Sequence, residues 1–456
     1  MNYSTQCFDS FLKLLRPKSY HRKTAKVLTL LATTSALVSY GNSPVLAELE
    51  DSPKTVIDEV WQIVNNEFVD YDFNHVDWKI KRQELLRKDY ADQKAAYKAI
   101  RQSLKGLGDP YTRFLDPQEY EELTSQTSGE LSGIGIRLGV DRQTSKLTVV
   151  EPIPNSPASA AGLKAGDHIV SINGKPSKLM TLEQASAEIK GEVGTEVKLK
   201  IQRSSQPAFD IAIARAQIEL PSVSYTLNEE QDSKVGYIKL DEFSSHAAEQ
   251  MQSAIKDLSQ KQASGFILDL RGNPGGLLFS SVEIARMWMK QGAIVSTIDR
   301  QGGNEKFSAN GKALTDLPLV VLVDGYSASA SEILAGALKE NHRAKVVGSR
   351  TYGKGTVQSV HALSDGSGLA VTIARYYPPS GMDINQKGIA PDIQVNLSRE
   401  QQTNLTINPN LVGTNADPQY ARAVTILKSE AASKAPKAPP ESLTERKSTS
   451  NSPQLN

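Results

Sequence analysis

The chain has 456 residues, of which 39% are hydrophobic and 23% are charged, and its formal net charge at pH 7 is +1. A chain of this length and composition can form two or three globular domains. The nearly balanced charge gives no support to nucleic-acid binding, which depends on a basic surface, and no nucleic-acid partner is expected.

Residues 1–47 have the features of a secretory signal peptide. Six Lys and Arg residues precede the apolar run 27–38, and we expect cleavage after Ala47. The apolar run is short for a membrane span, so we expect membrane contact only through the substrate or an uncleaved leader. Cleavage would leave an exported chain with a formal net charge of −4, because the leader holds six of the 52 basic and one of the 51 acidic residues. It would also remove the only cysteine, Cys7, which excludes disulfides, cysteine-ligated metals and cysteine catalysis.

Residues 48–128 are predicted to be a helical region. Apolar residues recur at helical spacing over 56–64, and the same pattern returns over 94–107. This spacing indicates an amphipathic helical cap.

Residues 129–216 are predicted to be a module of strands and tight turns. The segment 131–138 alternates hydrophobic and small residues as a strand does, and its glycines leave backbone N–H groups free to bind a carboxylate. These carboxylate-binding positions are Ser132, Gly133, Ile134 and Gly135. Together with the strand 169–172 and the turn at Asn173 and Gly174, the module resembles a PDZ domain in the circularly permuted order of bacterial proteases. The resemblance implies partners that are protein substrates with free, apolar C-terminal tails, since PDZ domains add such a tail to a sheet edge.

Residues 217–400 alternate predicted strands and helices. The strands lie at 235–240 and 266–270, and the helices at 246–260 and 280–290, which is typical of an α/β domain. Residues 401–456 are predicted to be a C-terminal extension. From about Ser429 its Lys, Ala, Pro, Ser and Thr composition predicts a disordered tail.

Ser329 and Lys354 are the candidate nucleophile and base. Ser329 lies in a run of small residues that closes the buried strand 319–324 and opens a helix, where free N–H groups and the helix dipole favour negative charge. Lys354 lies between two glycines, and a buried lysine can lose its proton and act as a base. The six histidines lie singly and outside any motif, which argues against a Ser-His-Asp triad. Taken alone, the serine run fits an ordinary helix start and the lysine a surface charge, but the two together favour a serine–lysine dyad.

A third segment joins them where the strand 265–270 leads through a glycine-rich turn into a helix. We expect Asp269 and Arg271 to hold each other and the loop in place rather than do chemistry. The turn exposes N–H groups, so the N–H groups of Gly275 and Ala330 can form an oxyanion hole. Read alone, the same turn is a strand-to-helix connection.

The segments 268–276, 327–332 and 353–358 together resemble the carboxyl-terminal processing proteases, also called tail-specific proteases. The resemblance extends to 108–117 and 387–392 and covers most of residues 50–398. It implies a multidomain α/β protein with a helical N-terminal cap, a β-rich PDZ domain and a serine protease core of the ClpP/crotonase-like type. The resemblance makes Ser329 the nucleophile, Lys354 the general base and Gln358 the group that orients the lysine. It implies supporting roles for Glu332, Asp269 and Arg271.

The chain particularly resembles cyanobacterial and chloroplast members that remove the C-terminal extension of the photosystem II reaction-centre precursor. That resemblance implies a location in the thylakoid lumen or periplasm. A general periplasmic quality-control protease would carry the same dyad, so it stays an alternative. A PDZ-bearing binding protein with an inactive core is less favoured, because Ser329, Lys354 and Gln358 are all intact. A metalloprotease is less favoured still, since the chain has no His-Glu-x-x-His motif. No cofactor or metal is expected.

Overall fold

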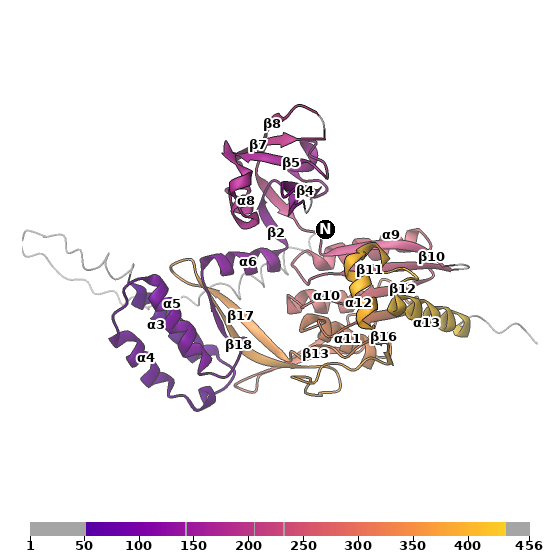
Figure 1. The fold of residues 1–456 in the computed structure, drawn as a ribbon. Coiled ribbons are helices and arrows are strands. Elements are labelled where there is room, and N and C mark those ends of the chain that lie inside the picture. Colours follow the sequence, from indigo (N-terminus) through magenta and orange to yellow (C-terminus); the bar gives the residue numbers. More distant parts are fainter. Residues whose placement is uncertain (1–51, 142–143, 205, 231–232, 435–456) are drawn as a thin grey trace, which may run out of the picture. The chain divides into compact units, whose positions relative to one another are not determined.

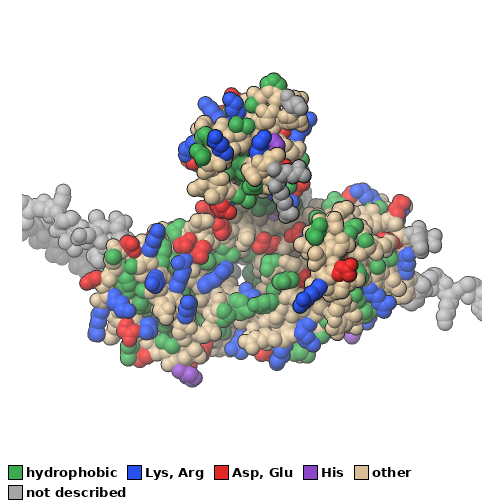
Figure 2. Space-filling model, viewed as in Figure 1, with side chains coloured by type: hydrophobic (Ala, Val, Ile, Leu, Met, Phe, Trp, Pro, Cys, Tyr) green, Lys and Arg blue, Asp and Glu red, His purple; other side chains and the backbone are tan. Residues whose placement is uncertain are grey.

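The structure is a computed structural model that describes residues 52–141, 144–204, 206–230 and 233–434 (Figure 1). The predicted signal peptide lies outside these residues. The described part has mixed α/β character, as the sequence predicts. None of its helices is both long enough and apolar enough to cross a membrane. Basic and acidic side chains are interspersed over the face seen in Figure 2.

The N-terminal region is helical, as predicted. Its elements are α3 (Pro53–Glu67), η1 (Phe73–His75), α4 (Trp78–Arg87), α5 (Gln93–Lys105), the short strand β1 (Arg113–Leu115) and α6 (Pro117–Ser128). Val56, Val60 and Val64 repeat at helical spacing along α3 and are buried in one core with Ile100 of α5. That core also contains Leu369 of the long strand β18 (Gly368–Tyr377), so the helices pack on a sheet.

The module over residues 129–216 is rich in strands. Its main sheet has the order β3-β4-β5-β7-β8, with β6 paired to β5, while β2 and β9 form a separate two-stranded ribbon. The elements are β2 (Glu130–Gly133), β3 (Ile136–Val140), β4 (Leu147–Pro152), α7 (Pro157–Ala160), β5 (His168–Ile172), β6 (Lys175–Pro176), η2 (Ser177–Leu179), α8 (Leu182–Ile189), β7 (Glu196–Gln202), β8 (Phe209–Ala214) and β9 (Ala216–Glu219). Alternate residues of β7 are buried in the core of the module, as its sequence pattern predicts. Because β3 lies at the edge of the sheet, one side of it can pair with an added strand.

The α/β domain is built on a six-stranded sheet with the order β10-β11-β12-β15-β16-β19. The strands from β11 to β19 are parallel, and β10 pairs antiparallel with β11. The elements are β10 (Val223–Glu230), β11 (Ser233–Leu240), α9 (Ala247–Gln260), β12 (Gly265–Asp269), α10 (Leu278–Trp288), β15 (Leu319–Val323), α11 (Ala330–Glu340), β16 (Lys345–Gly348) and β19 (Ile393–Gln394). Every residue of β12 and β15 is buried, because helices cover both faces of the sheet.

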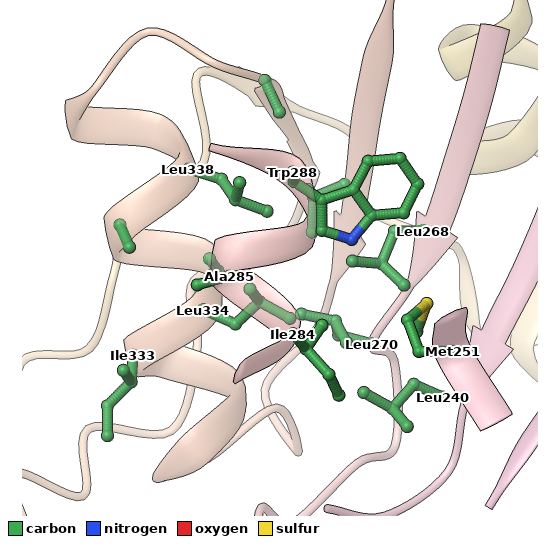
Figure 3. Close-up of a cluster of buried hydrophobic side chains, with 14 of the residues drawn as sticks. Leu240, Met251, Leu268, Leu270, Ile284, Ala285, Trp288, Ile333, Leu334 and Leu338 are labelled. Carbon is green, nitrogen blue, oxygen red and sulfur yellow. The ribbon is translucent and has the colours of Figure 1, made fainter. Parts of the chain in front are cut away.

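Helices α9, α10 and α11 cover one face of this sheet. Figure 3 shows Leu268 and Leu270 among Met251, Ile284 and Trp288, which come from these helices. The opposite face holds a second core, in which side chains of β12 and β15 contact α13 (Pro418–Lys434). Alternate residues of β12 and β15 are therefore buried in the first core, and the residues between them are buried in the second.

The C-terminal helices belong to this architecture. The sequence predicts an extension from residue 401, but α12 (Arg399–Ile407) and η3 (Pro409–Leu411) lead into α13, whose Tyr420 and Ala423 are fully buried against the sheet. Residues 429–434, where a disordered tail is predicted to begin, continue α13. Apolar side chains at helical spacing anchor the helix, so it does not end where the composition turns polar. Residues 435–456 lie outside the described residues.

A second sheet has the order β1-β18-β13-β14, with β17 also paired to β18. Its remaining strands are β13 (Ala293–Asp299), β14 (Asn304–Ser308) and β17 (Thr356–Ala362), and its pairs are antiparallel. Strand β18 pairs with β1 near its start and with β13 near its end. The Tyr376 N–H of β18 donates to the carbonyl of Gly355, so β18 also connects the helical region with the loop that follows β16.

Candidate active site

Ser329 lies on a strained turn between β15 and α11. Its backbone has φ 53° and ψ −116°, a conformation that residues other than glycine rarely adopt. The turn is held by Ser327, which is fully buried and whose hydroxyl donates to the carbonyl of Leu270 at 2.8 Å. Asp324 accepts hydrogen bonds from the N–H groups of Gly272 and Tyr326. The strand–turn–helix arrangement thus presents Ser329 at the N-terminus of α11, where negative charge is favoured.

The predicted oxyanion donors lie beside each other. A Cβ on Gly275, which has φ 109°, would lie 2.8 Å from the Cβ of Ser329 and 3.1 Å from the N of Ala330, so only glycine fits there. In the described part of the chain, the Ala330 N–H makes no hydrogen bond and can receive an oxyanion. The Gly275 N–H instead donates to Oδ1 of Asn273 at 2.8 Å. Gly275 can therefore serve as the second donor only if Asn273 releases it.

Glu332 joins the nucleophile turn to the lysine loop. Its side chain is fully buried, and Oε2 accepts the N–H groups of Ser329 and Lys354, both at 2.9 Å. Oε1 accepts the Thr351 hydroxyl at 2.6 Å and the Gly353 N–H at 2.7 Å. Burial raises the pKa of Glu332, and these hydrogen bonds act in the opposite direction. The carboxylate thus holds two segments that lie far apart in the sequence in one arrangement.

Tyr376, near the end of β18, makes a second connection between the same segments. Its ring is buried, and its hydroxyl lies 3.1 Å from the carbonyl oxygen of Ser329 and also contacts the carbonyl oxygen of Lys354. Sequence reasoning missed this residue, because an aromatic residue in a buried strand carries no signal beyond core packing.

Lys354 is half-buried, and its ammonium lies over the ring of Tyr111, with Nζ 4.9 Å from the ring centroid. Burial lowers the pKa of Lys354, as does the positive charge of Arg113, while the charges of Asp109 and Glu332 raise it. The direction of the net shift is the one that a lysine base needs. Among the described residues, the Lys354 amine and the Ser329 hydroxyl make no hydrogen bond to each other.

Gln358 does not contact the lysine amine in this arrangement. Its Nε2 donates to the hydroxyls of Thr356 at 2.9 Å and Thr372 at 3.2 Å. The Thr372 hydroxyl in turn donates to Oδ2 of Asp109 at 2.6 Å. Gln358 is therefore linked to the segment that carries Tyr111, and its orienting role stays a prediction.

Asp269 and Arg271 form a buried ion pair away from the nucleophile. Nε of Arg271 lies 2.9 Å from Oδ1 of Asp269, and its Nη2 lies 2.7 Å from Oδ2 of Asp417, directly before α13. Tyr237 also donates to Asp269 at 2.7 Å. The nearby Arg271 charge and hydrogen bonds hold the pKa of Asp269 below its usual value, although burial raises it. These contacts fix the loop after β12 to the C-terminal helix.

The predicted carboxylate site lies between β2 and β3. Ser132 and Gly133 end β2, where the Ser132 hydroxyl donates to the carbonyl of Gly191. Ile134 is fully buried, and Gly135 has φ 79°. In the part of the chain that the structure describes, the N–H groups of Ile134 and Gly135 make no hydrogen bond, and they lie directly before the free edge strand β3. Two free donors beside a free strand edge can bind the carboxylate and backbone of a peptide.

The described residues contain no cluster of three or more His, Cys, Asp or Glu side chains that could hold a metal ion.

Comparison with known proteins identifies two regions. The sequence profile of peptidase family S41 matches residues 234–395, and that of a PDZ domain matches residues 148–203. The chain is 39% identical over 394 residues to the carboxyl-terminal-processing protease of Synechocystis sp., covering 86% of this chain and 90% of that protein. It is 38% identical over 399 residues to carboxyl-terminal-processing peptidase 3, chloroplastic, of Arabidopsis thaliana, covering 81% of this chain and 77% of that protein. A solved structure of a photosystem II D1 C-terminal processing protease is similar with a TM-score of 0.50 and 35% identity, over 81% of this chain and 99% of that one.

Proposed function

The chain belongs to peptidase family S41 and is a carboxyl-terminal-processing protease of the serine type with a PDZ domain, and within it we propose that Ser329 is the nucleophile and Lys354 its general base. The observation that carries this proposal is the shared support of the two residues. Glu332 accepts both their backbone N–H groups, and the Tyr376 hydroxyl contacts both their carbonyl oxygens.

The chemistry follows from this assignment. Neutral Lys354 takes the proton of the Ser329 hydroxyl as its oxygen attacks the scissile carbonyl carbon. The Ala330 N–H stabilises the oxyanion of the tetrahedral intermediate, and Lys354 then gives the proton to the leaving amine. A water molecule, deprotonated by the same lysine, then attacks the acyl carbon, and the lysine returns this proton to the Ser329 oxygen as the ester bond breaks. For the first step Lys354 must move from the ring of Tyr111 to the serine hydroxyl.

The PDZ module supplies the proposed preference for C-terminal tails. The free N–H groups of Ile134 and Gly135 receive the terminal carboxylate, and the tail pairs with the open edge of β3. Cleavage then occurs within reach of that tail.

The proposed substrate is the photosystem II reaction-centre precursor, whose C-terminal extension the chain removes after export to the thylakoid lumen or periplasm. The name of the related solved structure supports this substrate. Equal rates on that extension and on unrelated apolar tails would favour the quality-control alternative.

Mass spectrometry tests the dyad and the tail preference together. The wild-type chain and Ser329→Ala are incubated with a peptide that has an apolar, alanine-containing tail, with the C-terminus either free or amidated. We expect only the wild type to cut, and to cut the free form faster. Cleavage by folded Ser329→Ala contradicts the nucleophile assignment, and equal rates on both peptides contradict carboxylate recognition.

A further inference from the structure

The segment from Asp109 to Arg113 reaches the lysine loop from the helical region. We propose that Tyr111 is a positioning residue for the reaction: its ring holds the Lys354 ammonium in the substrate-free enzyme and sets the pH at which the lysine becomes available as a base. The inference rests on the proposed role of Lys354.

The Tyr111 ring contacts the ammonium of Lys354. Nζ of Lys354 lies 4.9 Å from the centroid of the Tyr111 ring, which is within the range of a cation–π interaction. In the described part of the chain, this amine donates no hydrogen bond to a protein acceptor. Among the described residues, the direct contact of this half-buried ammonium is therefore an aromatic face, and it has no hydrogen bond to a carboxylate.

The position of the ring is fixed by Asp109. Its Oδ1 accepts the Tyr111 N–H at 3.1 Å, and its Oδ2 accepts the Thr112 hydroxyl and the Thr372 hydroxyl, both at 2.6 Å. Because Thr372 belongs to β18, the turn that carries Tyr111 is fastened to the same strand as Tyr376. The ring therefore lies at a defined place relative to the backbone of Lys354.

The Tyr111 phenol stays neutral under the conditions of the reaction. Burial raises its pKa to about 12, and the hydrogen bond and charge of Tyr352 and the charges of Asp109 and Glu332 act in the same direction. The ring thus interacts with the lysine through its π face and not as a phenolate.

The charged groups around Lys354 act in both directions. Arg113 on β1 favours the neutral amine, whereas Asp109 and Glu332 favour the ammonium. A cation–π contact favours the ammonium as well, since only the charged amine is attracted to the ring face. Its expected size corresponds to roughly 0.4 to 1.5 pH units in the protonation of the lysine. Replacing the ring should make the amine available at lower pH.

The test is the pH dependence of kcat/KM, whose acidic limb reports the base of the free enzyme. The full chain is used with a cleavable peptide, as wild type, Tyr111→Leu, Tyr111→Phe and Tyr111→Trp. We expect Tyr111→Leu to move the acidic limb to lower pH by roughly 0.4 to 1.5 pH units. At pH values below the wild-type limb, the variant should then have about 3- to 30-fold higher kcat/KM than the wild type. Phe keeps the ring and leaves the limb in place, and Trp, the stronger π donor, moves it up. Tyr90→Leu is the matched control, since Tyr90 is a tyrosine of the helical region whose hydroxyl donates to the carbonyl of Leu85, and it should leave the limb unchanged.

Two results would overturn the proposal. One is an acidic limb in folded Tyr111→Leu that stays in place or moves up. The other is an equal downward shift in Leu and Phe, which would assign the effect to the hydroxyl. If Tyr111→Leu does not fold, the Tyr111→Trp variant decides: an acidic limb that stays in place or moves to lower pH in this variant also overturns the proposal. Full activity of Lys354→Ala would instead refute the proposed function, so the two failures are distinguishable.

Discussion

Replacing Glu332 with Gln tests how the site is held together. An amide has one oxygen, so it can accept from only one of the two pairs of donors that the carboxylate serves. In the better orientation of the glutamine amide, its oxygen still accepts the N–H groups of Ser329 and Lys354. Its NH2 group then faces Thr351 and Gly353. The Thr351 hydroxyl can reverse and accept from the NH2 group, whereas the Gly353 N–H loses its acceptor.

The expected size of the effect follows from this count. One orphaned buried N–H costs about 1 to 3 kcal/mol, so Glu332→Gln should lower the free energy of unfolding by that amount. Glu332→Leu orphans the N–H groups of Ser329, Gly353 and Lys354, which corresponds to about 3 to 9 kcal/mol before any gain from the added apolar surface. Because Gln keeps the two contacts that align the dyad, it should retain part of the activity, and Leu should retain none that is measurable.

Urea unfolding and peptide cleavage by the full chain check both variants. The reasoning is refuted if Glu332→Leu unfolds at the wild-type urea concentration and cuts at the wild-type rate. It is also refuted if Gln is the more damaging of the two, since that would mean the acceptor oxygen facing Ser329 and Lys354 is not what matters.

Three further changes address other parts of the molecule. Lys354→Met should reduce turnover by about 10²- to 10⁴-fold. Because burial lowers the folded-state pKa of this lysine, its charge destabilises the fold below that pKa and the penalty disappears as the pH rises past 10.5. The Met variant should therefore melt above wild type at pH 7 and lose that advantage in alkali, and equal melting temperatures at both pH values would contradict a buried lysine. Gly135→Ala places a Cβ 2.3 Å from the Cβ of Ser156 at φ 79°, so it should reduce the preference for free over amidated tails by about tenfold, and an unchanged preference would remove this loop from tail recognition. Arg271→Met leaves two buried carboxylates without their cation and should cost about 3 to 5 kcal/mol in urea unfolding, whereas Lys261→Met, which breaks an exposed pair, should change little.

The sequence alone predicts the local features of this protein well. Small residues after an apolar strand indicate the helix start at Ser329, and paired glycines indicate the turn at Lys354. Alternating residues indicate the strands of the PDZ module. Each of these signals lies within a few consecutive residues, because backbone conformation and the burial of one face depend on short-range spacing.

Only the tertiary structure decides which of these segments meet. Glu332, which the sequence predicts only as a supporting residue, joins Ser329 to Lys354, and Tyr376 does the same from a strand that has no motif of its own. The ring of Tyr111 contacts Lys354, although more than two hundred residues separate them in the sequence. Helix α13 covers one face of the six-stranded sheet, and the composition of the C-terminal segment does not indicate this packing. Periodicity and turn chemistry are local, whereas these contacts depend on the order of the strands in the sheets, so they can be assigned only once the chain is folded.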